Sequence, residues 1–292
     1  MKILKKICIA VAVYVLIVLV LYSCNVIWTS PSQYRVTNPE FIGVPVMDMD
    51  AYDTISETHR RPYWYTVESE SSKGKVFVVG VDHTKDIDHA HLDTLVNVWS
   101  KAEPSVALVE GRLGFLFTWF QNPVNKYGES GLVSKIAKSE GVKLYTWEPT
   151  KQDEISLLLK DFTPEQLATF HSFRPYFSNM RHGKPANPEA KLQEYLESRT
   201  DNDALRNVFT SWKELDSIWR KDFPEIEWRN HSDRYGWPKG YLSEMANASN
   251  LLRDYHLVQI INELVNKGEV VFACVGVSHA PRIEATLKNL IK

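Results

Sequence analysis

Two short apolar runs near opposite ends of the chain are each followed by the same pattern, Gly-x-x-His. The run 75–79 leads into Gly80-Val81-Asp82-His83, and the run 269–275 leads into Gly276-Val277-Ser278-His279. Consecutive apolar, mostly β-branched residues are typical of strands buried on both faces of a sheet. Ligands of open α/β sheets bind beyond the carboxyl ends of the strands. We therefore expect His83 and His279 to lie in one cleft.

Two further buried strands are expected between these runs, and helical segments alternate with them. The strand 105–109 ends in Glu110, and the strand 142–147 ends in Glu148. A short first strand over 63–67 and helices over 88–101 and near 131–140 complete this half. Strands that alternate with helices predict βαβ units, and therefore an α/β fold with a mainly parallel sheet.

The segment 151–268 changes character and has the pattern of helices. Thr163-Pro164-Glu165-Gln166 is typical of a capped helix start. We expect further elements in this order: helices over 188–198 and 201–221, a loop over 223–240, a long helix over 243–267, a last strand, and a helix over 280–291. The predicted organisation is a domain over 56–292 with a helical insertion at about 155–240, preceded by a proline-containing linker over 29–55.

The first 28 residues form a basic and then apolar segment. Three lysines precede the apolar stretch 7–22, and the next charge is Arg35. An uncleaved membrane helix needs about 17–25 residues. A lipoprotein-type signal, with Leu21-Tyr22-Ser23-Cys24 at its end, and a cleaved secretory signal are the alternatives. All three leave the basic end in the cytoplasm. We therefore expect a membrane-anchored protein with its body on the periplasmic or cell-surface side.

Charge and cysteine content exclude two classes of protein. The formal net charge is −2, and the basic residues of the first segment contribute to it, so no basic excess remains to hold a nucleic-acid backbone. Cys274 is the one cysteine beyond the N-terminal segment, which leaves no internal disulfide in the body. The oligomeric state stays open.

Glu110 and Arg253 are the other candidate site residues. Glu110 follows a buried strand, where a charge is costly unless it is solvated or paired; a carboxylate in water at the strand end is the alternative. Arg253 lies four positions before Leu257 on the long helix, on the face that packs inward. It can pair with Glu110 or with a substrate oxyanion. Alternatively, it is an exposed arginine that pairs with Asp254 or Glu263.

Two imidazoles and one carboxylate are suited to a divalent metal site with an open position for water. His83, Glu110 and His279 could hold Mn²⁺, Co²⁺ or Zn²⁺ and lower the pKa of a bound water to about 7. Without a metal, the same groups could supply a general base. Either histidine alone could be a hydrogen-bonded turn residue. The nearby acids and histidines of 82–91 are interpreted as ordinary helix caps.

Together these motifs resemble the Tiki/TraB family, within the wider set that includes erythromycin esterase-like and ChaN-like proteins. The resemblance covers roughly 74–291 and is carried by both Gly-x-x-His motifs, Glu110, Arg253 and the acidic-x-x-x-Gln element Glu148–Gln152. Asp254 stands where the family has Asn after the arginine. The resemblance implies two α/β halves that share a sheet. It also implies hydrolase chemistry, including metal-dependent peptide cleavage, and haem or iron binding in ChaN-like members.

We therefore expect an extracytoplasmic, membrane-anchored hydrolase that depends on a divalent metal and acts on a peptide or small molecule, as a metallopeptidase-like or esterase-like enzyme. His83, Glu110 and His279 would bind the metal or poise water, and Arg253 would stabilise the oxyanion. The alternative is a non-catalytic protein that binds haem, a metal or a peptide through the same histidines. The aromatic loop 115–120 is expected to line the substrate pocket or to be plain core.

Overall fold

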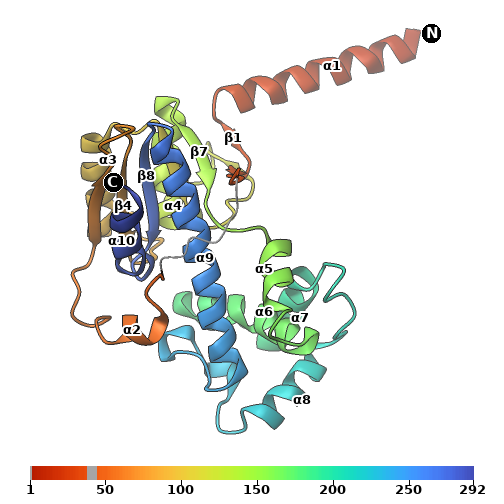
Figure 1. The fold of residues 1–292 in the computed structure, drawn as a ribbon. Helices are drawn as coiled ribbons and strands as arrows, with labels where there is room; N and C mark the ends of the chain where they lie inside the picture. Colours follow the sequence, from red (N-terminus) through yellow and green to blue (C-terminus); the bar gives the residue numbers. More distant parts are fainter. Residues whose placement is uncertain (1, 38–44) are drawn as a thin grey trace. The chain divides into compact units, whose positions relative to one another are not determined.

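The computed structural model describes residues 2–37 and 45–292, and the chain divides into two compact units (Figure 1). The first unit joins the chain up to Glu148 with Asp254–Lys292, and the second is Pro149–Arg253. The long helix α9 (Tyr241–Asn266) contributes residues to both units. The two units are described separately below.

The first unit is built around a mostly parallel sheet, which confirms the expected α/β class. Within the described residues this sheet has six strands, and each neighbouring pair is parallel except the last, β4 with β3, which is antiparallel. In spatial order the strands are β2 (Ser32–Gln33), β7 (Lys143–Thr146), β5 (Val106–Val109), β8 (Val270–Gly276), β4 (Lys75–Val81) and β3 (Tyr63–Glu68).

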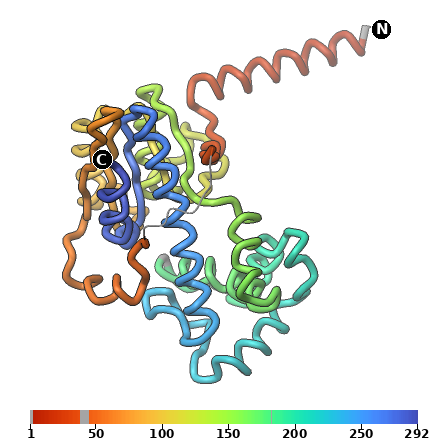
Figure 2. Tube along the Cα trace, viewed as in Figure 1, coloured from red at the N-terminus to blue at the C-terminus, as the bar shows by residue number. Residues whose placement is uncertain are grey.

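The last strand, β8, lies between β4 and β5, which come from the first half of the chain (Figure 2). Its register against β4 runs from the pair Lys75–Val270 to the pair Val81–Gly276. The side chains of these central strands are almost entirely buried on both faces, as their continuous apolar runs predict. Both Gly-x-x-His motifs therefore begin at the same edge of the sheet.

Helices cover the sheet because their apolar stripes must be buried against it. α3 (Ala90–Ala102) and α4 (Pro123–Glu140) share one hydrophobic core with alternate strand residues. Members of this core are Val79, Ala107 and Cys274 from the strands and Leu95, Trp99 and Val133 from the helices. α10 (His279–Leu290) packs against β3, β4 and β8.

Part of the segment 29–55, expected as a linker, belongs to the first unit. Ser32–Gln33 forms the edge strand β2 beside β7, and Met49–Asp53 forms the short helix α2, which Asp48 caps. Met47 donates a backbone hydrogen bond to the carbonyl of Arg282. Residues 38–44 lie outside the described part of the chain.

The helix α1 (Lys2–Ser23) precedes the sheet. In the described residues it is the one helix that is long and apolar enough to cross a membrane, and it is not buried against the protein. A signal sequence can have the same length and composition, so membrane anchoring stays a prediction. α1 leads into β1 (Ile27–Trp28), which pairs antiparallel with β6 (Leu116–Phe117).

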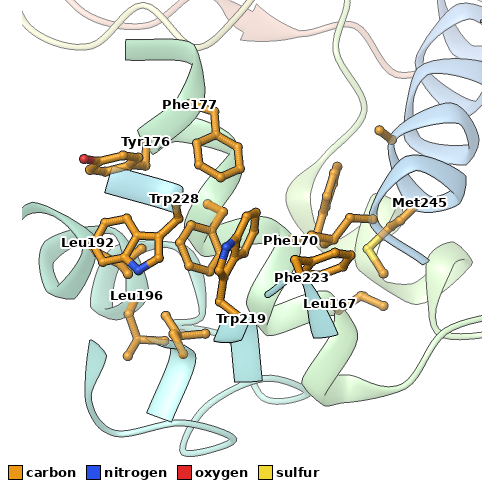
Figure 3. Packing of buried hydrophobic residues seen from close by; sticks show 14 of the residues in the cluster. Leu167, Phe170, Tyr176, Phe177, Leu192, Leu196, Trp219, Phe223, Trp228 and Met245 are labelled. Atoms are coloured by element: carbon orange, nitrogen blue, oxygen red, sulfur yellow. The ribbon is translucent and has the colours of Figure 1, made fainter. Parts of the chain in front are cut away.

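The second unit is helical and has its own aromatic core (Figure 3). Its helices are α5 (Lys151–Leu158), α6 (Pro164–Asn179), α7 (Pro188–Arg199), α8 (Trp212–Asp222) and the first part of α9, with 3₁₀ turns at Met180–His182, Trp228–Asn230 and Asp233–Tyr235. Trp219 and Trp228 are fully buried there, and the Trp219 ring centroid lies 4.6 Å from that of Phe173. The predicted capping box of Thr163 and Gln166 is confirmed.

Two helix boundaries were wrong. The helix expected over 201–221 begins at Trp212, because the residues before it form turns. Asn202 accepts backbone hydrogen bonds from Ala204 and Leu205, which is the usual way in which asparagine competes with a helix. α4 begins at Pro123, before the expected 131, and it is kinked at Gly128, where φ is 62°.

Candidate functional site

Three adjacent parallel strands end side by side at the carboxyl edge of the sheet. β4 is followed by His83, β5 by Glu110, and β8 by His279, which is the first residue of α10. In the spatial order β5, β8, β4, the strand that leads to His279 lies in the middle. Strand order alone therefore directs these side chains to one place.

The side chains of His83, Glu110 and His279, called the trio below, lie close together. Oε1 of Glu110 is 3.8 Å from Nε2 of His83 and 3.9 Å from Nε2 of His279. The exposed fraction of the side chain is 40% for His83, 13% for Glu110 and 5% for His279. The trio thus has one histidine that faces solvent and one that is held inside the protein. The catalytic and metal-binding roles of these residues stay predictions.

Each histidine of the trio contacts a buried carboxylate through its Nδ1 atom. Nδ1 of His83 lies 2.5 Å from Oε1 of Glu129, and Nδ1 of His279 lies 2.5 Å from Oδ1 of Asp254. An ionised carboxylate only accepts hydrogen bonds, so each Nδ1 carries the proton and donates it. In the neutral form of each imidazole, Nε2 then has a lone pair on the side of Glu110.

The kink in α4 explains how Glu129 reaches His83. Gly128 has a left-handed backbone, and a Cβ there would lie 2.5 Å from the carbonyl oxygen of Thr84. The absence of a side chain at Gly128 lets α4 approach the segment after β4, and Glu129 also accepts a hydrogen bond from the backbone of Thr84. Glu129 was not predicted as a site residue. The stretch Gly128-Glu129-Ser130-Gly131, an acid among small residues, was the available signal.

His279 is fixed on two further sides. The second oxygen of Asp254 lies 2.8 Å from Nη1 of Arg282, which is also fully buried. The ring of Trp147 lies edge-on to the His279 imidazole, with centroids 5.3 Å apart, and its indole nitrogen donates to the carbonyl of Cys274. Asp254, expected as a possible partner of Arg253, pairs with His279 and Arg282.

The glycines of the two motifs are required for close packing. Neither Gly80 nor Gly276 has a positive φ, so their backbone conformation does not require glycine. A Cβ on Gly80 would lie 2.7 Å from the Cβ of Ala280, and a Cβ on Gly276 would lie 3.1 Å from Nε2 of His83 and 3.3 Å from Oε2 of Glu110. The backbone amide of Gly276 also donates to Oε2 of Glu110 at 2.6 Å. Gly276 is therefore part of the wall of the site.

The residue types of the trio are suited to binding a metal ion, but their side chains are not arranged around one position. Within residues 2–37 and 45–292, no group of three or more histidine, cysteine or acidic side chains is arranged to hold a metal ion as the side chains stand. Metal-binding histidines usually donate their other ring N–H to a carboxylate, as both histidines do here. Two ligand atoms about 2.1 Å from one ion lie at most about 4.2 Å apart, and both Nε2–Oε1 distances meet this limit.

Two further groups of residues were predicted from the sequence. Arg253 is the last residue of the second unit and is buried, as its helix position predicts; its role at an oxyanion stays a prediction. The acids and histidines after β4 make local contacts, as expected. His89 caps α3, and Asp82 pairs with Arg61 at 2.9 Å.

The second unit contains a buried polar cluster that the sequence analysis did not single out. Glu154 lies 3.0 Å from Nη1 of Arg174 and accepts a hydrogen bond from Ser249. Burial by itself raises the pKa of Glu154, but Arg174 and its other partners hold it at about 2. Burial lowers the pKa of the neighbouring His171 to about 4, although the charge of Glu154 opposes this shift. His171 is therefore neutral at pH 7.

Comparison of this chain with protein-family models, curated proteins and solved structures finds no match. The Tiki/TraB family, expected from the motifs, therefore stays a prediction.

Proposed function

We propose that this chain is an extracytoplasmic, membrane-anchored hydrolase of the Tiki/TraB type. In this proposal the trio activates a water molecule for attack on a peptide or small-molecule substrate. One observation carries it: two histidines, each held through Nδ1 by a buried carboxylate, direct Nε2 at the same oxygen of Glu110. The two-half arrangement of the sheet that the resemblance implies belongs to the same proposal.

His83 is the general base in this proposal because it is the histidine that solvent reaches. Its Nε2 takes a proton from water, and Glu129 stabilises the imidazolium that forms. Glu110 orients the same water through Oε1, since Gly276 already occupies Oε2. The buried His279 positions Glu110 and the water from the other side.

A divalent cation at this site would be held by His83, Glu110 and His279. When bound, it would supply a water whose pKa is lowered to about 7. The protein's own part is then to orient the two imidazoles, since the carboxylates that contact Nδ1 leave both Nε2 atoms on the side of Glu110.

The first experiment is thermal unfolding of the full chain in detergent, for the wild type and for His83→Ala/His279→Ala, with and without Mn²⁺, Co²⁺ or Zn²⁺. A ligand at a hundredfold excess over its Kd stabilises the native state by about 2.7 kcal/mol. Stabilisation of the wild type alone supports a metal on the trio. Equal behaviour of both proteins removes the metal and leaves direct water activation by His83.

The second experiment tests hydrolysis itself, with a quenched fluorescent peptide library and a panel of chromogenic esters. Wild type is compared with His83→Ala and with His231→Ala, whose imidazole lies in the second unit and contacts the carbonyl of Gly236. Turnover that is lost in His83→Ala and kept in His231→Ala supports the proposal. Full turnover in both variants contradicts it. Metal or haem binding that depends on His83, without turnover, favours the binding-protein alternative.

A further inference from the structure

Three aromatic side chains are exposed on one short loop of the first unit. Phe115, Trp119 and Phe120, which flank β6, are 58%, 65% and 82% exposed. The loop 115–120 is therefore not plain core, which was one of the two expectations. The ring of Phe117 lies 5.1 Å from that of Phe120 and 5.5 Å from that of Trp119, so these rings form one continuous apolar surface. Such surfaces mark interaction sites.

This aromatic loop is tied to the end of α1 by backbone pairing. β6 lies antiparallel to β1, with Phe117 opposite Ile27, and the amide of Thr118 donates to the carbonyl of Val26 at 2.8 Å. Three residues separate the last residue of α1, Ser23, from Ile27. Four steps along an extended chain span at most about 14 Å. Ile27 therefore lies within that reach of the helix end, and Phe117 on the neighbouring strand is about 5 Å from Ile27, whatever direction the helix takes.

The junction between α1 and β1 has several defined contacts. The indole nitrogen of the buried Trp28 donates to the carbonyl of Asn25 at 2.8 Å. The side-chain amide of Asn25 donates to the carbonyl of Lys138 at 3.3 Å, and the ammonium of Lys138 lies 5.6 Å from the centre of the Trp28 ring. These contacts fasten the last residues before β1 to the same body that carries the loop.

We propose that the aromatic loop lies in the headgroup layer of the membrane that anchors this chain, and so holds the domain against the lipid surface. Tryptophan favours this layer because its ring is apolar and its indole N–H is polar. Phenylalanine occurs with tryptophan on apolar surfaces that enter the boundary between headgroups and acyl chains. One cation that can meet lipid phosphates contacts the loop, since Lys126 donates to the carbonyl of Phe115. A second, Arg112, is exposed three residues before Phe115 in the sequence. The charge and the apolarity of the loop thus fit one occupant, a phospholipid surface.

The inference rests on the anchoring part of the proposed function, and it holds for both forms of anchor. An uncleaved α1 ends at Ser23, and a lipid attached to Cys24 would begin one residue later. In either case the lipid phase begins within a few residues of β1, and β1 is paired to the loop.

The test uses the full chain in phosphatidylcholine/phosphatidylglycerol vesicles, with lipids that carry bromine near the headgroup as quenchers of tryptophan fluorescence. Wild type is compared with Trp119→Phe, which keeps the loop apolar, and with Trp212→Phe, a matched loss of one tryptophan from the second unit. Trp119 is one of nine tryptophans, so we expect the brominated lipids to remove about one ninth of the wild-type fluorescence. This quenched intensity should be lost in Trp119→Phe and should be unchanged in Trp212→Phe. Equal quenching in wild type and Trp119→Phe overturns the inference.

The mass of the mature chain completes the test. A chain that keeps α1 or carries a lipid on Cys24 supports the inference when Trp119 is quenched. A mature chain that has neither anchor overturns it. Neither result bears on hydrolysis by the trio, which is measured separately in detergent with the His83→Ala variant.

Discussion

Oδ1 of Asp254 lies 2.5 Å from Nδ1 of His279, and the carboxylate that makes this contact is completely buried. Its other oxygen lies 2.8 Å from Arg282. A buried carboxylate is stable only when it is paired and hydrogen-bonded. One acid on α9 therefore fixes a histidine and an arginine that both belong to α10.

Replacing Asp254 with Asn should impair catalysis more than its small change in shape suggests. An amide can donate to Nδ1, which favours the tautomer with the proton on Nε2 and removes the lone pair directed at Glu110. Carboxylates that orient a site histidine in this way typically contribute about 10- to 100-fold to activity, so we expect turnover to fall by that factor. The measurement is kcat on the substrate that the library identifies. Asp82→Asn, at an exposed ion pair with Arg61, is the control, and a near-normal rate for Asp254→Asn would refute the assigned role.

The two histidines of the trio should differ in their contribution to stability. His279→Ala removes one of the partners of a buried carboxylate, and breaking such a pair typically costs about 3–5 kcal/mol. His83 is 40% exposed, so water can replace it beside Glu129, and His83→Ala should cost about 1 kcal/mol. Urea unfolding of both variants measures the free energies. Equal losses would show that the burial of Asp254 does not govern the effect.

Gly276→Ala should disturb the trio directly. The added methyl group would lie 3.1 Å from Nε2 of His83 and 3.3 Å from Glu110, so one of them must move. Overpacking of this kind costs about 1–3 kcal/mol, and we expect any metal-induced stabilisation to be lost. Gly141→Ala is the control. An alanine there is strained by the positive φ, but its Cβ would have no other atom within 4 Å. A Gly276→Ala protein with an unchanged metal response would contradict the packing argument.

Acid should weaken the protein through His171. Its pKa is lowered to about 4 in the folded protein and is 6.5 when unperturbed, so between these values the unfolded chain binds more protons. The contribution of His171 to the free energy of unfolding is therefore fully present above pH 6.5. It is lost as the pH falls towards 4, by about 3 kcal/mol in total. The lowered pKa of Glu154 acts in a lower window, from 4.5 to about 2.

The measurement is the unfolding temperature of the full chain in detergent between pH 7.5 and 4.5, for the wild type and for His171→Gln. Glutamine does not take up a proton in this range, so we expect a flatter profile for the variant. If the two profiles run parallel, His171 is not the group that titrates.

The local parts of the fold could be predicted because their signals are local. Apolar runs located β4, β5, β7 and β8 to within about two residues, and the long helix was placed to within the same margin. The first half of the helix expected over 201–221 was wrong, because the turn-forming side chain of Asn202 outweighed the helical pattern. Glu129 was missed because its contact with His83 depends on the kink at Gly128 and joins residues that are 46 positions apart in the sequence.

The sequence by itself determined which residues stand at strand ends. The alternation of apolar runs and helical segments indicates where strands stop, and His83, Glu110 and His279 follow those stops. Only the tertiary structure decided that these ends are neighbours, with β8 inserted between β4 and β5, and that Glu129 and Asp254 hold the two imidazoles. The physical reason is that strand order and buried ion pairs depend on contacts between distant segments, whereas strand and helix periodicity is a property of neighbouring residues.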